Sequence, residues 1–176
     1  ASGVEKLREL TPRTMDAVCS FGELLSSRIV AAALRDADIE SQWLDARDFL
    51  ITDDTFNRAR PILHLVRERL AKLVPPLLQA GKVPVTQGFI GATAAGLTTT
   101  MGRESSDYTG SLIGSALGAD AIEIWTDVTG VLTADPRVVE HPRQVSQLSF
   151  AEAYELTYFG AKVLHPRTMH PAEAGQ

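Results

Sequence analysis

One stretch of the chain, residues 98–109, reads TTTMGRESSDYT and brings hydroxyl groups, a glycine, an arginine and an aspartate into a polar turn. The run of small residues 110–118 that follows predicts a helix beginning where the turn ends. The first backbone N–H groups of a helix lack intrahelical partners and lie at the positive end of its dipole, so phosphates and carboxylates bind there. Ser105 or Ser106 is the expected N-cap, and Asp107 falls in the first turn, where a carboxylate is favoured. Taken alone, this stretch fits an anion site and an ordinary capped helix equally well.

The length, composition and charge of the chain narrow the kinds of protein it can be. A chain of 176 residues with 44% hydrophobic and 22% charged residues is expected to fold as about one globular domain. Its net charge of −5 lacks the basic excess that nucleic-acid binding needs. No apolar run approaches the length of a membrane span, and residues 1–6 do not resemble a signal peptide, so we expect a cytoplasmic protein. Cys19 is the only cysteine and is expected to be a small core residue.

The hydrophobic pattern predicts alternating helices and strands. We expect helices over residues 11–37, 58–80 and 149–158, strands over 39–45, 83–88 and 121–127, and a hairpin over 89–99. Each long helix should bury one apolar face, and Pro75-Pro76 should bend the second. Residues 46–57 are expected to form a polar connection. Alternating helices and strands predict a layered α/β fold.

Several polar residues outside the opening stretch are candidates for function, and each has a plainer alternative. Glu23 lies close to the apolar side of the first helix, where it is either solvated or held near a ligand. Thr126 and Asp127 end a predicted strand, where ligands of open α/β sheets bind. Lys162 is either a surface residue or a cation aimed at phosphate. His165 and His170 are too few for a metal site.

An acidic cluster at Thr52-Asp53-Asp54 could suggest a metal ion. It lacks the central glycine and the following glutamate of a calcium loop, which favours a solvated turn.

Five segments together resemble the aspartokinases of the amino acid kinase family. They are SFGELLS at 20–26, QGFIG at 87–91, residues 98–109, WTD at 125–127 with DPR at 135–137, and FGAKVLHP at 159–166. The resemblance covers residues 10–171 and implies a three-layer αβα sandwich with a mostly parallel central sheet. It also implies transfer of a phosphoryl group from MgATP to the side-chain carboxylate of L-aspartate, at the entrance to lysine, threonine and methionine synthesis, by a homo-oligomeric enzyme.

The resemblance assigns roles by position. Glu23, Arg103, Ser105 and Ser106 are expected to bind the amino acid substrate, and Asp107 and Lys162 are expected to serve catalysis. The expected nucleotide contacts are Thr126, Asp127, Leu132, Arg137, Lys162 and Val163. ATP and Mg²⁺ are the implied cofactors, and no metal is expected to be held by a dedicated protein site.

The chain also departs from the family pattern. It has no Lys-Phe-Gly-Gly strand before residue 10 and no regulatory ACT domain, so we expect residues 11–171 to be a partial catalytic domain, flanked by residues 1–10 and by a truncated end at 172–176. Such a fragment is expected to have impaired activity. Glu104-Ser105 stands where many members have two glycines, and Leu132 where many have a tyrosine.

Two other functions remain open. The chain could be a non-catalytic interaction module, or it could belong to a kinase for another amino acid such as glutamate or acetylglutamate, or for a nucleoside monophosphate.

Overall fold

A computed structural model of the chain describes residues 10–126, 130–135, 137–158 and 166–173. The chain divides into two compact units, Ala1–Ser106 and Asp107–Gln176, which we call unit 1 and unit 2. The sequence prediction of a single domain over 11–171 did not include this division. Lys162 and its neighbour Val163, together with Asp127, lie outside the described residues.

Unit 1 is an α/β unit with mainly parallel strand pairs, as predicted. Its strands are β1 (Ser41–Trp43), β2 (Ile51–Thr52), β3 (Val83–Val85), β4 (Ile90–Thr93) and β5 (Thr98–Thr100). β1 pairs in parallel with β3, β2 pairs in parallel with β4, and β4 pairs with β5 in the antiparallel sense. The predicted hairpin is therefore confirmed, with Gly96 at a φ of 78° in its turn. The described strands form two sheets, of two and three strands.

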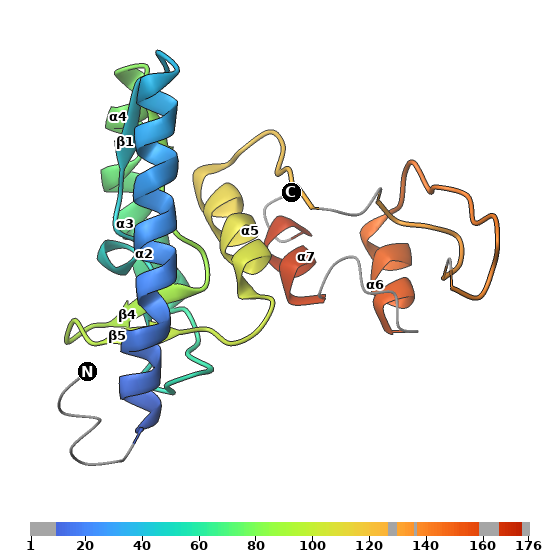
Figure 1. Ribbon diagram of the computed structural model, residues 1–176, viewed down its shortest axis with the longest axis horizontal. Helices are drawn as coiled ribbons and strands as arrows, with labels where there is room; N and C mark the ends of the chain where they lie inside the picture. The colour runs from blue at the N-terminus through green and yellow to red at the C-terminus, as the bar shows by residue number, and fades with distance from the viewer. Residues whose placement is uncertain (1–9, 127–129, 136, 159–165, 174–176) are drawn as a thin grey trace. The chain divides into compact units, whose positions relative to one another are not determined.

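Helix α2 (Pro12–Asp36) is the longest element of unit 1 and runs alongside the strands (Figure 1). It begins as predicted, because Pro12 occupies the first turn and the Thr11 hydroxyl accepts a hydrogen bond from the Thr14 N–H at 3.1 Å. Its contacts are with β1, β3 and β5.

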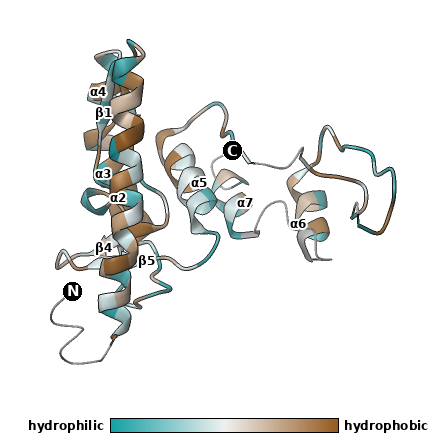
Figure 2. Ribbon diagram, viewed as in Figure 1, coloured by the Kyte–Doolittle hydropathy of each residue, from teal (hydrophilic) through white to brown (hydrophobic). Residues whose placement is uncertain are grey.

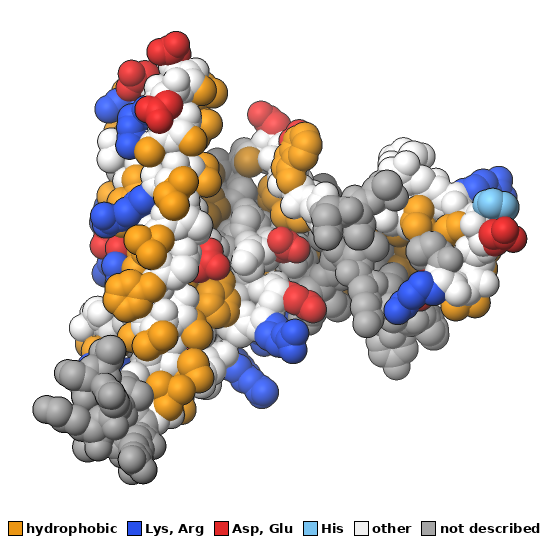
Figure 3. Space-filling model, viewed as in Figure 1, with side chains coloured by type: hydrophobic (Ala, Val, Ile, Leu, Met, Phe, Trp, Pro, Cys, Tyr) orange, Lys and Arg blue, Asp and Glu red, His pale blue; other side chains and the backbone are white. Residues whose placement is uncertain are grey.

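The prediction that α2 buries its apolar face is wrong. Its buried residues are small or polar, namely Asp16, Ser20, Ser27 and Ala31. Phe21, Leu25 and Ile29 are 62%, 61% and 68% exposed. Cys19, expected in the core, is exposed too. Figures 2 and 3 show this apolar side running along the outside of the helix. Small residues let the helix lie close to the strands, and buried hydrogen bonds hold it there.

By length and composition α2 is also apolar enough to cross a membrane, contrary to the expectation from the sequence. Its inner side argues for a packed helix instead. Asp16 and Ser27 on that side bond to residues far away along the chain in unit 1. A membrane span would leave such polar groups without these partners.

Ala46 and residues 49–52 belong to the core, so the predicted polar connection at 46–57 is wrong over much of its first half. A short 3₁₀ helix, η1 (Ala46–Asp48), leads into β2, and the Ala46, Phe49 and Leu50 side chains are completely buried. The apolar run that reveals this segment is only three residues long, which is too short for a periodicity signal.

Two helices follow, α3 (Leu63–Leu73) and α4 (Pro75–Gln79), and the predicted break at the prolines is confirmed. α3 begins later than predicted because the preceding residues bond to strands. The Ala59 N–H donates to the Thr100 carbonyl oxygen at 3.0 Å, and the Ile62 N–H donates to that of Ile51 at 2.8 Å. Nearby, Asp53 Oδ1 accepts from the Thr55 and Arg60 N–H groups, and so forms a local turn.

Helix α5 (Ser105–Leu117) starts at the end of unit 1 and continues into unit 2, which also contains α6 (Phe150–Tyr158) and α7 (Pro166–Glu173). The capping box of α6 is confirmed, since the Ser149 N–H donates to Glu152 Oε2 at 2.8 Å and the Glu152 N–H donates to Ser149 Oγ at 3.2 Å. The strand predicted over 121–127 is wrong for its described part, because residues 121–126 are in no strand and pair with none of the described strands. Helix α7 was not predicted.

Candidate functional site

The turn between β5 and α5 contains the stretch on which the sequence prediction centred. Gly102 and Glu104 have φ angles of 86° and 60°, and the helix begins at Ser105. The Ser105 hydroxyl donates to the Gly102 carbonyl oxygen at 2.7 Å, closing the turn. The N-cap predicted at Ser105 or Ser106 is therefore wrong, since the residue before the helix is Glu104. The first N–H groups of α5 still begin at this turn, as an anion site requires.

A second turn lies against the first. A Cβ atom added to Gly88 would sit 2.8 Å from Ser106 Cα, so only a glycine permits this approach. The Met101 N–H also donates to the Phe89 carbonyl oxygen at 3.0 Å. The turn after β3, which contains part of the QGFIG segment, and the start of α5 therefore come together.

Glu23 lies on the inner side of α2, half-buried, beside a chain of hydrogen bonds that leads to the second turn. The Ser27 hydroxyl donates to the Glu23 carbonyl oxygen at 2.7 Å and accepts from Gln87 Nε2 at 2.7 Å and Trp43 Nε1 at 3.0 Å. Gln87 Oε1 accepts from the Ala46 N–H at 2.8 Å. Because Gln87 directly precedes Gly88, these bonds fix the helix turn containing Glu23 relative to Gly88.

Asp16 lies on the same side of α2, nearer its N-terminus, and ties the helix to β5. Its carboxylate is completely buried and accepts from the Thr100 N–H at 2.9 Å and the Thr100 hydroxyl at 2.7 Å. Glu23 thus lies between two anchors on α2, about 10 Å along the axis from Asp16 and about 6 Å from Ser27. The anchors lead to the two turns described above. The structure in this way places Glu23 on the side of α2 that is tied to the Arg103 turn.

The charges at the site are of both signs. Arg103 is exposed and takes part in no ion pair within the described part of the chain. The Glu23 carboxylate is likewise without a hydrogen-bond donor among the described residues. A free guanidinium and a free carboxylate suit a ligand with both a carboxylate and an ammonium group.

The unit 1 site rests on three residues that the sequence prediction did not name as site residues, Asp16, Ser27 and Gln87. Gln87 was noted only as part of the QGFIG segment, and the signal at Asp16 was a carboxylate next to Met15 in an apolar helical pattern. The partners of Asp16 lie 41 and 84 residues away along the chain, and Ser27 and Gln87 lie 60 residues apart. Periodicity does not reveal such pairs.

Of the six residues predicted to contact the nucleotide, the structure describes Thr126, Leu132 and Arg137, all in unit 2. Asp107 is half-buried in the first turn of α5, and Thr126 is exposed. The Leu132 backbone forms an isolated antiparallel β-bridge with that of Gln144. Arg137 is exposed and pairs with Asp135 at 2.6 Å, and the hydrogen bonds that its guanidinium donates to this carboxylate raise the pKa of the guanidinium.

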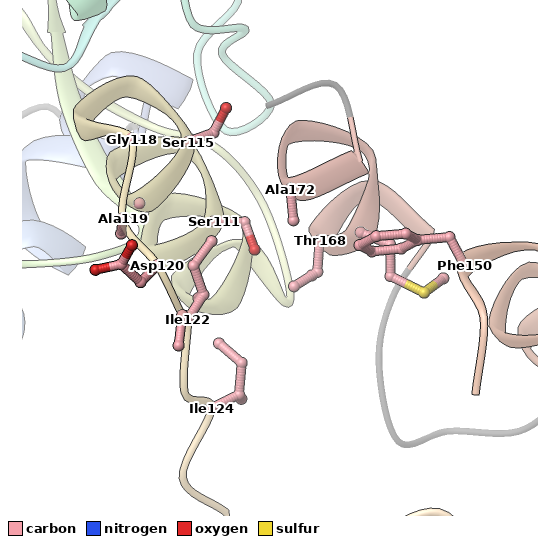
Figure 4. Close-up of a pocket in the computed structure, with 13 residues that line it drawn as sticks. Ser111, Ser115, Gly118, Ala119, Asp120, Ile122, Ile124, Phe150, Thr168 and Ala172 are labelled. Carbon is pink, nitrogen blue, oxygen red and sulfur yellow. The ribbon is translucent and has the colours of Figure 1, made fainter. Parts of the chain in front are cut away.

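A separate cavity of about 370 Å³ lies within unit 2. Figure 4 shows Ile122 and Ile124 beside it, with Phe150 and Thr168 across from them. Its lining also includes Ser111, Gly114, Ser115, Gly118, Ala119, Asp120, Ala121, Met169 and Ala172. Thr126, Leu132 and Arg137, the predicted nucleotide contacts that the structure describes, do not line this cavity.

Comparison with known proteins identifies relatives of the chain. The model of the amino acid kinase family matches residues 2–176. The lysine-sensitive aspartokinase 3 of Escherichia coli is 46% identical over 92% of this chain, which covers 36% of that protein. The chloroplastic aspartokinase 1 of Arabidopsis thaliana is 43% identical over 99% of this chain, which covers 31% of it. The chain therefore spans about a third of the length of these relatives.

Solved structures of aspartokinases also match the chain in fold. E. coli aspartokinase III in complex with aspartate and ADP matches with a TM-score of 0.87 and 45% identity, over 94% of this chain and 37% of that one. The same enzyme in complex with lysine and aspartate matches with a TM-score of 0.84 over the same shares. The similarity in sequence and fold extends through both units, and the chain belongs to the amino acid kinase family.

Proposed function

We propose that this chain carries the aspartate-binding part of an aspartokinase, which transfers the γ-phosphoryl group of ATP to the side-chain carboxylate of L-aspartate. The observation that carries the proposal is the set of residues around the two joined turns. Glu23, Arg103 and Ser106 stand in segments that match a structure of an aspartokinase bound to aspartate and ADP.

The substrate's chemistry fits the charges of this site. Glu23 would accept hydrogen bonds from the ammonium group of aspartate, and Arg103 would bind one of its carboxylates. The first N–H groups of α5, at Ser105 and Ser106, would add donors at the positive end of the helix. A dicarboxylate with one ammonium group satisfies all three.

The reaction needs positioning more than acid–base chemistry. The attacking carboxylate of aspartate is already ionised at neutral pH, so no general base is required. Two anions must be held in line while their charge is neutralised. Asp107, in the first turn of α5, would orient the cationic groups that neutralise this charge.

We propose that a magnesium ion enters this site with the nucleotide. The described residues contain no cluster of three or more His, Cys, Asp or Glu side chains suited to a metal. Mg²⁺ in kinases is held by phosphates, water and one or two carboxylates, and it neutralises charge on the transferring group. Asp107 is the described carboxylate that we propose for this role.

We assign the nucleotide to residues named by resemblance. Thr126, Asp127, Leu132, Arg137, Lys162 and Val163 are proposed to contact ATP. For Arg137 to reach a phosphate, its guanidinium must leave Asp135 or bind alongside it. The surface position of this pair keeps the cost of breaking it low.

The proposal is tested by substrate preference. Release of ADP from MgATP is measured with aspartate, glutamate and acetylglutamate, using the protein expressed from its intact gene. We expect turnover with aspartate to exceed that with the other two by at least tenfold. Preference for glutamate or acetylglutamate would show a kinase for another amino acid, and calorimetric binding of neither aspartate nor ATP would show a non-catalytic module.

The assignment of Arg103 is tested by Arg103→Ala. Loss of a charge-assisted contact should weaken aspartate binding by about 2 kcal/mol, roughly thirtyfold, in a calorimetric titration. Arg67→Ala, at another exposed arginine of unit 1, serves as the control and should bind aspartate normally. Unchanged affinity in Arg103→Ala would remove Arg103 from the site.

A further inference from the structure

We infer that Asp16 is a positioning residue of the substrate site, which sets the distance between Glu23 on α2 and the Arg103 turn. This inference rests on the proposed function, because the site it orders is the one proposed for aspartate. Asp16 itself is completely buried, so the role inferred for it is to position other groups and not to bind substrate directly.

The contacts of Asp16 converge on the turn that carries Arg103. The Thr100 N–H and hydroxyl both donate to its carboxylate, at 2.9 and 2.7 Å, and Thr100 is the last residue of β5 before that turn. The Asn57 N–H donates to both carboxylate oxygens, at 3.1 and 2.9 Å. Asn57 in turn lies against the turn, since a Cβ on Gly102 would sit 3.2 Å from its carbonyl oxygen. Asp16 therefore holds both the strand and the loop that border Gly102.

The other end of this link is Glu23. It follows Asp16 by two helical turns, so both side chains leave α2 on the same side. A helix is stiff over such a length, and a shift at Asp16 therefore moves Glu23 by a similar amount. Since substrate must reach Glu23 and Arg103 together, an error of about 1 Å in their spacing weakens binding.

Stability alone does not account for a carboxylate at this place. Burying a carboxylate is costly, and well-packed apolar residues of similar volume often give equal or greater stability. A carboxylate accepts hydrogen bonds of defined geometry from two segments, here those of Asn57 and Thr100. An apolar side chain cannot accept hydrogen bonds. The geometry suits a residue that fixes one helix relative to one turn.

The test compares Asp16→Ala with Asp16→Asn in the protein expressed from its intact gene. Asparagine keeps one acceptor oxygen for the Thr100 N–H, and its amide can donate to the Thr100 hydroxyl. We expect Asp16→Ala to raise the KM for aspartate at least tenfold while the KM for ATP changes less than twofold. Asp16→Asn should restore most of the aspartate KM.

Thr100→Val keeps the test decisive if Asp16→Ala fails to fold. It removes only the hydroxyl donor and should raise the aspartate KM about threefold, again without an effect on ATP. An unchanged aspartate KM in the folded variants, or equal changes for aspartate and ATP, would overturn the inference. Absence of aspartate-dependent turnover in the unaltered protein would instead overturn the proposed function, and the two failures are thus distinguishable.

Discussion

Glu104 shows how the substrate turn is built from single residues. Its φ of 60° places a residue with a side chain in the left-handed region, which costs about 1 kcal/mol or more. Many relatives were expected to have glycine there. Glu104→Gly should raise the free energy of unfolding by about 1 kcal/mol, as measured by urea denaturation. Glu104→Ala removes the carboxylate but keeps the strain, so equal stability of the two variants would contradict this explanation.

Gly88 matters for a different reason, the space its missing side chain leaves. A Cβ here would lie 2.8 Å from Ser106 Cα and 3.3 Å from the Ser106 carbonyl oxygen, both backbone atoms. Gly88→Ala should therefore cost about 1–3 kcal/mol of stability and also weaken aspartate binding.

Gly22→Ala is the matched control for Gly88→Ala. Gly22 lies in α2 with no atom near enough to touch a new Cβ, so alanine should stabilise the helix by about 1 kcal/mol. Thermal unfolding of both variants distinguishes the two environments. A Gly88→Ala protein as stable as Gly22→Ala would show that the two turns do not touch.

Individual site residues could be predicted from the sequence only where their chemistry was visible locally. Arg103 and Asp107 stand out in a polar turn, and Glu23 stands out beside apolar neighbours. Asp16 did not stand out and Gln87 was noted only within the QGFIG segment, because the partners that give them their roles lie far along the chain.

At the scale of elements, α2 is held to the strands by buried hydrogen bonds. Ser27→Ala would leave Gln87 Nε2 without its 2.7 Å partner and Trp43 Nε1 without its 3.0 Å partner. An unsatisfied buried donor costs about 1–3 kcal/mol, so we expect a loss in that range in urea denaturation. Ser26→Ala is the control, because the exposed Ser26 hydroxyl bonds only within its own helix and should change stability by less than about 0.5 kcal/mol. Equal effects of the two variants would contradict the proposed anchor.

Asp45, at the start of η1, makes the stability of unit 1 depend on pH in the acid range. Burial opposes ionisation of Asp45, but hydrogen bonds from the Arg47 side chain and backbone N–H outweigh burial and lower the pKa of this carboxyl below 3.8. The stabilisation is present above 3.8, the ordinary pKa, and is lost as pH falls through the lowered value. The unfolding free energy of Asp45→Asn should therefore fall less steeply below pH 3.8 than that of the unaltered protein.

Arg47→Leu checks the cause of this acid dependence. It removes the side-chain donor that lowers the pKa of Asp45 but keeps the backbone N–H, so its unfolding free energy should flatten with acid in part. If urea denaturation at several pH values gave this variant the steep fall of the unaltered protein, Arg47 would not be the cause.

Elements with a long or local signal were predicted well. The start of α2, the proline break before α4, the β4–β5 hairpin and the capping box of α6 were all confirmed. Burial was predicted less well. The spacing of apolar residues shows that α2 has two sides, but hydrogen bonds of Asp16 and Ser27 decide which side faces the strands.

At the scale of the whole molecule, two compact units carry different parts of the proposed reaction. The substrate residues Glu23 and Arg103 belong to unit 1, and the residues proposed for the nucleotide belong to unit 2. The α/β class and the family could be predicted from the sequence, because five separated motifs agree in order. The division at Ser106 could not, since it falls at the start of a continuous helix.

The most direct test of the account is ATP-dependent formation of aspartyl phosphate by the protein expressed from its intact gene, trapped as the hydroxamate. We predict hydroxamate from aspartate, little from glutamate, and a loss of product with Arg103→Ala that additional aspartate reverses. Product from glutamate but not aspartate, or equal product with and without Arg103, would contradict the assignment of this site.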